Sequence, residues 1–378
     1  MKGRLLLRER PSVRNEDTIS RHAYDSQPQH ITKQKINKIT FLLTCNGRVS
    51  RFFYVTSQFK GMNRLATITC ITLAVLSAAC TRQSAGEPVR AVYYWSTVFD
   101  MDSVKTRFMT EHGVRKMYIR YFDVVQDDGG QPVPNATLRF RTAVPRGVEA
   151  VPTVYIVNEC MAADTAGLAD RLLRRILQMN ATNDVDGVKE IQIDCDWTRR
   201  TEGRYFGFLR TLASKAKAEG LEVSATIRLH QLSMAPPPVS RGVLMMYNTG
   251  DFTDLRQKKP ILDMRDAAPY LRHIGSYGLP LASAYPIYSW RILFRGGRYV
   301  GIMHRDDDLP VLPGDSIVTR VPDINDILDA ARAINRRRSD ANSEVILFDL
   351  SIQNITRYKP DDYEKIFDSH TAGRQPVH

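Results

Sequence analysis

The chain has 378 residues, enough for one large domain with appendages, and its hydrophobic content of 43% and charged content of 25% are typical of a globular protein. The formal net charge of +12 is unevenly placed. Residues 1–61 hold 12 Lys or Arg against 4 Asp or Glu, which leaves only +4 for the rest of the chain. Because the sequence has no basic helix or aromatic–basic repeat, we expect no nucleic-acid partner.

A secretory signal is predicted over residues 62–80. The basic start Met62-Asn-Arg64 precedes a mostly apolar run over residues 65–76, and small residues then lead into Cys80. The apolar run is shorter than the roughly 20 residues that span a bilayer. The ending resembles a bacterial lipobox, with Ser77 where Leu or Val is usual. We therefore predict that Cys80 is lipidated; the alternative is an ordinary cleaved signal in which Cys80 has no role.

The segments on either side of this signal are interpreted from it. Residues 1–61 lack sustained periodicity, so we predict an N-terminal extension that is disordered or not normally made; a basic tail before the apolar run is the alternative. Residues 81–88 form a short polar linker. A lipid anchor would hold the following domain to a membrane in the cell envelope, on its periplasmic or outer-surface side.

Cysteine and acidic residues give no metal signal in the remaining chain. Lipidation would leave Cys160 and Cys195 in the folded domain, too few for a disulfide framework and without the spacing of a zinc site. Asp306-Asp-Asp308 lacks the alternating ligands of a calcium loop and indicates a solvated turn. We expect no metal and no cofactor.

Strand and helix patterns alternate along residues 89–370. Eight strand-like runs are centred near residues 90, 118, 152, 192, 226, 245, 284 and 348. Amphipathic helices are predicted at residues 100–112, 165–179, 205–219, 267–277 and 324–337. Alternation is typical of a parallel sheet, eight strands favour closure, and no glycine-rich phosphate loop follows the first strand. We therefore predict an α/β fold, a (β/α)8 TIM barrel.

Residues 291–322 do not fit a simple connection from a strand to a helix. They contain the turn-like stretch Phe294-Arg-Gly-Gly-Arg298 and a polar excursion. We predict a hairpin insertion near the seventh strand, over the mouth of the barrel.

The run from Lys189 to Trp197 carries the strongest functional signal. As an extended strand it places four apolar side chains on one face: Ile191, Ile193, Cys195 and Trp197. The opposite face is polar: Gln192, Asp194 and Asp196. The apolar face suits helices packed outside a barrel. The polar face suits the lumen near the C-terminal ends of the strands, where such barrels carry their active sites.

Residues at the ends of the other predicted strands would surround the same mouth. The candidates for contact with a substrate are Trp95, Arg120, Glu159, Arg228, His230, Tyr247, Asn248, Trp290 and Asp349. Sugar faces stack on aromatic rings, and glycosidic cleavage usually uses a pair of carboxyl groups, so this mixture suits a carbohydrate. Neighbouring carboxylates disfavour each other's ionisation, so one of Asp194 and Asp196 could stay protonated near neutral pH.

Two motifs resemble those of chitinase-type (family 18) glycoside hydrolases. Ile-Gln-Ile-Asp194-Cys-Asp196-Trp is similar to the DxxDxDxE motif of their fourth strand. Met245-Met-Tyr247-Asn248 is similar to the MxYD motif of their sixth strand. Over roughly residues 89–356, the chain also resembles a family of bacterial glycosidase-like barrel lipoproteins that share this fourth strand.

The resemblance implies a TIM barrel that acts on a glycan without a cofactor, with Asp194 and Asp196 as the inward aspartates that orient a substrate. In the chitinase-type enzymes the final glutamate of the first motif is the proton donor. The chain departs from that pattern at three positions, where Ile191, Thr198 and Asn248 replace acids.

We predict a carbohydrate-active envelope lipoprotein. As a glycoside hydrolase it would use Asp196 as acid/base or to orient the substrate, with Asp194 as its electrostatic partner. The alternative is a catalytically inactive barrel that binds a glycan or organises an envelope complex, because Thr198 stands where the acid should be. In a purely structural role, both aspartates would pair with Arg120 and Arg228 inside the barrel.

Overall fold

The computed structural model describes residues 42–45, 48–51, 88–303 and 308–370, in two units. In the first unit, Met1–Arg82, strands β1 (Leu42–Cys45) and β2 (Arg48–Arg51) form an antiparallel hairpin. The predicted signal with Cys80, and the linker apart from its last residue, lie outside the described residues. In the part of the chain that is described, no helix is long and apolar enough to cross a membrane.

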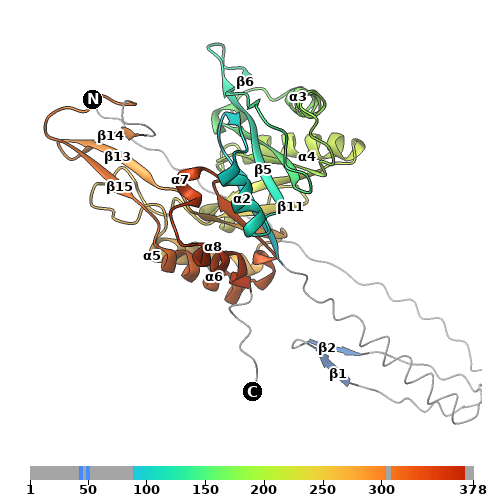
Figure 1. The fold of residues 1–378 in the computed structure, drawn as a ribbon. Coiled ribbons are helices and arrows are strands. Elements are labelled where there is room, and N and C mark those ends of the chain that lie inside the picture. Colours follow the sequence, from blue (N-terminus) through green and yellow to red (C-terminus); the bar gives the residue numbers. More distant parts are fainter. Residues whose placement is uncertain (1–41, 46–47, 52–87, 304–307, 371–378) are drawn as a thin grey trace, which may run out of the picture. The chain divides into compact units, whose positions relative to one another are not determined.

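The second unit, Gln83–His378, is built on a closed parallel barrel (Figure 1). Its strands are β3 (Val89–Tyr94), β5 (Lys116–Gln126), β8 (Glu149–Ile156), β9 (Glu190–Asp194), β10 (Glu222–Arg228), β11 (Arg241–Met245), β12 (Leu281–Pro286) and β16 (Glu344–Phe348). The last strand pairs with the first, and β3 also pairs with β5, which closes the ring. The predicted (β/α)8 TIM barrel is confirmed.

Helices between the strands cover the outside of the ring, and two further helices, α7 and α8, follow the last strand. They are α2 (Ser103–Glu111), α3 (Leu168–Thr182), α4 (Glu202–Ala218), α5 (Met264–Leu271), α6 (Ile324–Arg337), α7 (Ile352–Ile355) and α8 (Pro360–Phe367). Figure 1 shows α6 and α8 side by side beneath the barrel. Each buries an apolar stripe, so the helices stabilise the barrel by removing that stripe from water.

The predicted helix over residues 267–277 differs in the structure. It begins earlier, at Met264, because the side chain of Asp263 accepts a hydrogen bond from the backbone N–H of Arg265 and so caps the first turn. It ends at Leu271, and a separate 3-10 turn, η3 (Ile274–Ser276), follows. Propensity alone cannot locate such a start, because a cap four residues before the predicted start at residue 267 decides it.

The central strand β9 has the predicted alternation. The apolar side chains of this stretch are fully buried against the helices: Ile191 and Ile193 in the strand, and Cys195 and Trp197 beyond its end at Asp194. On the lumen side, the hydroxyl of Tyr93 donates a hydrogen bond to Gln192 Oε1 at 2.7 Å. Because strand side chains alternate with a period of two, Asp194 faces the same interior one step closer to the mouth.

The insertion after the seventh strand is larger than the predicted hairpin. Strands β13 (Trp290–Arg295), β14 (Arg298–Ile302) and β15 (Asp315–Arg320) form a three-stranded antiparallel sheet with β13 in the centre. This sheet projects from the barrel in Figure 1. Trp290 therefore belongs to the insertion and not to the barrel strand β12, which ends at Pro286.

Buried charges close the end of the barrel at which the strands begin. Lys116 Nζ lies 2.7 Å from a carboxylate oxygen of Glu190 and 3.4 Å from one of Glu344. Arg241 lies 2.7 Å from Glu344, and the Tyr118 hydroxyl donates to the same carboxylate at 2.5 Å. The lysine and both carboxylates are at most 7% exposed, so their charges must be matched inside the protein.

We expect Lys116→Met to lower the free energy of unfolding by about 3 kcal/mol at pH 7, because it leaves two buried carboxylates without their lysine. Urea denaturation measures this. The matched control is Arg256→Met, which removes an ion pair whose arginine is 90% exposed and should cost less than about 1 kcal/mol. Equal losses in the two variants would show that the buried network contributes no more than a surface pair.

Candidate functional site

A cavity of about 830 Å³ opens where the barrel strands end. Each of the eight strands, or the residues directly after it, contributes to its wall. The structure brings together nine of the residues that the sequence singled out: Trp95, Arg120, Asp194, Asp196, Arg228, Tyr247, Asn248, Trp290 and Asp349. Residues more than 250 positions apart in the chain thus share one cavity, which we name the mouth cavity.

Two predicted contact residues lie elsewhere. Glu159 does not line the mouth cavity, because the chain turns into a 3-10 helix, η1 (Asn158–Met161), directly after β8. His230 lies in a second 3-10 helix, η2 (Leu229–Ser233), and lines an adjoining hollow of about 290 Å³. That hollow shares Asp196 and Arg228 with the mouth cavity, so His230 lies beside the site.

The two aspartates share one arginine. Arg228, at the end of β10, donates from Nη2 to Asp194 Oδ1 at 2.9 Å and from Nε to Asp196 Oδ1. The hydroxyl of Thr226 donates to the same oxygen of Asp194 at 2.6 Å. The side chain of Asp194 is 5% exposed, whereas that of Asp196, beyond the strand end, is 52% exposed. Asp194 is therefore a buried anchor, and Asp196 is the carboxylate of the pair that is open to the cavity.

Burial and ion pairing have opposite effects on the pKa values of Asp194 and Arg228, which form a trio with Asp196. Burial raises the pKa of Asp194, and the charge of Arg228 and the Thr226 hydrogen bond offset part of that rise. Burial alone would lower the pKa of Arg228, but Asp194 and then Asp196 raise it above its ordinary value. The arginine thus stays protonated, and the trio carries a net negative charge when both carboxyls are ionised.

The second arginine has a different partner from the one that a structural role predicted. Arg120 donates from Nε to Asp123 Oδ1 at 2.7 Å and also pairs through Nη2 with the other oxygen. Its guanidinium lies over the ring of Trp95, 5.5 Å from the centroid. Of the two arginines proposed to neutralise the aspartates, only Arg228 does so, and Arg120 positions a tryptophan instead.

A third carboxyl lines the cavity from the opposite wall. Asp349 follows β16, and its Oδ1 accepts a hydrogen bond from Asn354 Nδ2 at 2.5 Å. Burial raises the pKa of Asp349, partly offset by hydrogen bonds from Asn354 and Ser351. Among the described residues, this carboxyl is therefore the one in the cavity wall that combines a raised pKa with the absence of a cationic partner.

A cluster of aromatic rings lines the cavity. The ring of Phe348 lies 5.4 Å from Trp95, 5.2 Å from Tyr247 and 5.7 Å from Tyr288. Tyr288 in turn contacts Trp290 at 5.6 Å and donates from its hydroxyl to Asn248. These flat surfaces beside carboxylates and amides are what the faces and hydroxyls of a sugar require.

No acid occupies the position of the chitinase-type proton donor. Thr198 lies beyond β9, where its backbone N–H donates to Thr201 Oγ1 at 2.9 Å. Glu202 is the first residue of α4 and does not line the mouth cavity. Neither residue therefore places a proton donor against Asp196.

The structure adds wall residues that the sequence did not single out, among them Tyr155, Tyr288, Phe348, Asn354 and Arg357. Phe348 and Tyr155 lie on predicted strands, so a consistent search of strand ends could have found them. Asn354 and Arg357 lie in and after α7, beyond the last strand, and no pattern in that segment predicts that it folds back over the mouth.

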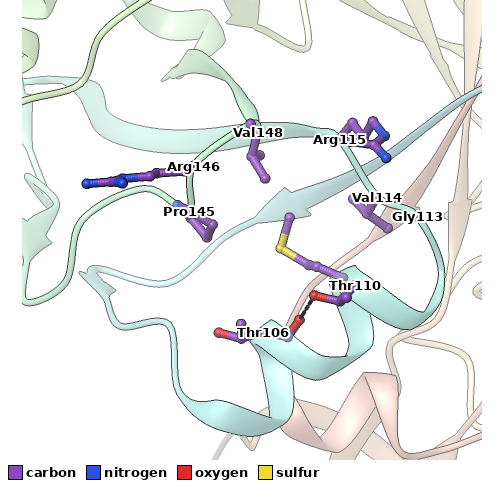
Figure 2. A pocket seen from close by; sticks show the side chains of 10 residues that line it. Thr106, Thr110, Gly113, Val114, Arg115, Pro145, Arg146 and Val148 are labelled. Carbon is purple, nitrogen blue, oxygen red and sulfur yellow. Dashed lines mark hydrogen bonds between the residues drawn. The ribbon is translucent and has the colours of Figure 1, made fainter.

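Another hollow lies near the opposite end of the barrel. Figure 2 shows it beside α2, with Arg115 and Arg146 on either side. It measures about 180 Å³ and adjoins the residues where β5 and β8 begin. The Thr110 hydroxyl donates to the backbone oxygen of Thr106 at 3.0 Å, and both arginines are exposed. It is a shallow surface feature at the end of the strands where barrels do not carry active sites.

Within the described residues, no group of three or more His, Cys, Asp or Glu is arranged to hold a metal ion. Cys160 and Cys195 are both buried free thiols, and burial raises the pKa of each. Of the predicted acidic turn Asp306-Asp-Asp308, only Asp308 lies within the described residues.

Comparison with known proteins places this geometry in a fold class. A chitinase from Bacteroides thetaiotaomicron superposes with a TM-score of 0.51 at 13% identity, over 77% of this chain and 99% of that chain. A chitinase from Chromobacterium violaceum ATCC 12472 superposes with a TM-score of 0.50 at 11% identity, over 76% of this chain and 100% of that chain. No protein-family model matches the chain, and no curated protein does.

These likenesses show the fold: the second unit is a TIM barrel of the kind found in chitinase-like glycoside hydrolases. The resemblance predicted from the fourth and sixth strands is confirmed at that level. The identities are too low to carry an activity from those proteins to this one.

Substitution of Arg228 should lower the free energy of unfolding, because it leaves the buried carboxyl of Asp194 without its cation. In Arg228→Gln the pKa of Asp194 rises further, because its cation is lost. A carboxyl with a higher pKa in the folded than in the unfolded state loses stability as pH rises through the folded pKa. We expect a deficit in unfolding free energy that is small near pH 4 and reaches about 3 kcal/mol at pH 7.

Urea denaturation across that pH range measures the deficit. The control is the double variant Arg228→Gln with Asp194→Asn, which removes the buried charge and should recover most of the stability at pH 7. A deficit that does not change with pH would mean that Arg228 contributes packing and not charge.

Proposed function

We propose that the mouth cavity binds a glycan outside the cytoplasm. The observation that carries the proposal is the composition of the mouth cavity: aromatic rings in mutual contact and an accessible carboxylate, Asp196, at the end of a barrel where active sites lie. The pairing of Asp196 with Arg228 holds the carboxylate ready to accept hydrogen bonds from sugar hydroxyls. The fold of chitinase-like hydrolases supports the same ligand class.

Glycoside hydrolysis is the second candidate, and Asp349 is the observation that favours it. A carboxyl with a raised pKa can donate a proton, and Asp196 across the cavity could act as the second carboxyl that cleavage requires. Thr198 in the donor position counts against the chitinase-type reaction. We therefore favour binding over hydrolysis.

We expect Trp95→Ala to weaken glycan affinity about tenfold, the value of one aromatic contact with a sugar face. Isothermal titration against a panel of neutral and acidic oligosaccharides measures it. The matched control is Tyr299→Ala, a 38% exposed aromatic residue of β14 outside the mouth cavity, which should bind as the unaltered protein does. If no panel member binds the unaltered protein, the proposed function is wrong.

The same mixtures, assayed for new reducing ends, separate the two candidates. Binding without product supports a binding barrel. Release of reducing ends that disappears in both Asp196→Asn and Asp349→Asn, with folding and binding retained, would assign hydrolysis to this carboxyl pair.

We further propose that the mature chain begins at Cys80 and is anchored by lipid in the cell envelope. The three-part signal and the small residues before the cysteine support this. We expect incorporation of labelled palmitate in a bacterial host, its loss in Cys80→Ala, and no change in the control Cys70→Ala. An intact mass that retains residues before Cys80 would contradict the anchor.

A further inference from the structure

Arg357 is a cation in the mouth cavity that is held by neutral groups. It lies two residues after α7, which folds back over the barrel end, and it lines the cavity. Nε donates to the backbone oxygen of Ile287 at 3.2 Å. Nη2 donates to Ser289 Oγ at 2.8 Å and to Asn354 Oδ1 at 3.3 Å. These contacts fix one edge of the guanidinium, and no carboxylate among the described residues pairs with its charge.

The other side of this guanidinium is available to a ligand. Nη1 of Arg357 has no hydrogen-bond or ion-pair partner among the described residues, and it is not among the buried polar atoms that lack one, so solvent reaches it. A guanidinium stays protonated at every physiological pH. A fixed, solvent-reached cation in a cavity wall is therefore a site for an anionic group.

Two of the three other arginines in the wall provide an internal comparison. Arg120 is neutralised by Asp123, and Arg228 is shared by Asp194 and Asp196. Arg357 differs because every acceptor that contacts it is a carbonyl, hydroxyl or amide oxygen. The nearest acid along its hydrogen bonds is Asp349, which is separated from it by the amide of Asn354.

The mouth cavity is consequently polarised. The wall from β9 and β10 carries two carboxylates against one arginine. The wall from β16 and the segment after α7 carries Arg357, with the Asp349 carboxyl held by Asn354, and Arg291 of β13 also lines the cavity. A ligand with an acidic substituent at one end and hydroxyls at the other would lie in one orientation, with its acidic group away from Asp194 and Asp196.

We propose that the ligand is an acidic glycan, whose carboxylate or sulfate group accepts a hydrogen bond from Nη1 of Arg357. This inference rests on the glycan binding proposed above. The inference concerns the ligand class alone and does not depend on whether the glycan is cleaved.

The test compares each acidic oligosaccharide with its own neutral form on the full chain. Oligogalacturonide, alginate and hyaluronan oligosaccharides are titrated beside their carboxyl-reduced forms, and a chondroitin sulfate oligosaccharide is titrated beside its desulfated form. We expect one acidic member to bind about tenfold to a hundredfold more tightly than its neutral partner, the effect of one charged hydrogen bond. The carboxylate and sulfate arms identify the group.

Variants localise the preference. Arg357→Gln should weaken the acidic ligand about tenfold or more and leave the neutral one within about twofold, and Arg357→Lys should restore part of the difference. Arg332→Gln, on the outer helix α6, is the matched control and should change neither affinity. Should Arg357→Gln fail to fold, the ligand pairs on the unaltered protein still decide the question.

The outcomes separate this inference from the function on which it rests. Equal affinity for acidic and neutral partners, or a preference for the neutral one, overturns the acidic assignment and leaves glycan binding intact. A preference that survives Arg357→Gln also overturns it. An absence of binding by every acidic and neutral member would instead refute glycan binding itself.

Discussion

The guanidinium of Arg228, shared by a buried and an accessible aspartate, is the interaction on which the site depends. It keeps Asp194 inside the barrel at a tolerable cost, and it holds Asp196 at the rim. An unpaired carboxylate at the position of Asp194 would have to take up a proton or reach solvent. The ion pair is thus both a structural requirement of the lumen and the reason that a carboxylate faces the cavity.

Charged side chains gather at both ends of the barrel, and the two groups have different roles. At the end where strands begin, Lys116, Arg241 and two glutamates neutralise one another in a nearly closed network. At the end where strands finish, the charges are incompletely matched and open to solvent. Mutual neutralisation serves stability, whereas unmatched charge beside a cavity is available for recognition.

The composition of the cavity is the basis on which we propose ligand recognition ahead of hydrolysis. An acid is absent from the position after β9 at which chitinase-type enzymes carry their donor, and the insertion β13–β15 together with the segment after α7 adds Trp290 and Arg357 to the wall. Fold and function separate here because the strands set the geometry of the ring while the segments after them set its chemistry.

The sequence alone determined the barrel, because eight runs of alternating apolar residues with helices between them leave few other arrangements for a parallel sheet. It also determined the inward face of β9, since a period of two fixes which of its side chains share the lumen. Only the tertiary structure decided that Arg228 pairs with both aspartates, whereas Arg120 pairs with Asp123. It also decided that Arg357, and not Glu159, lines the mouth cavity. Those outcomes depend on contacts between residues far apart in the chain, where local periodicity carries no information.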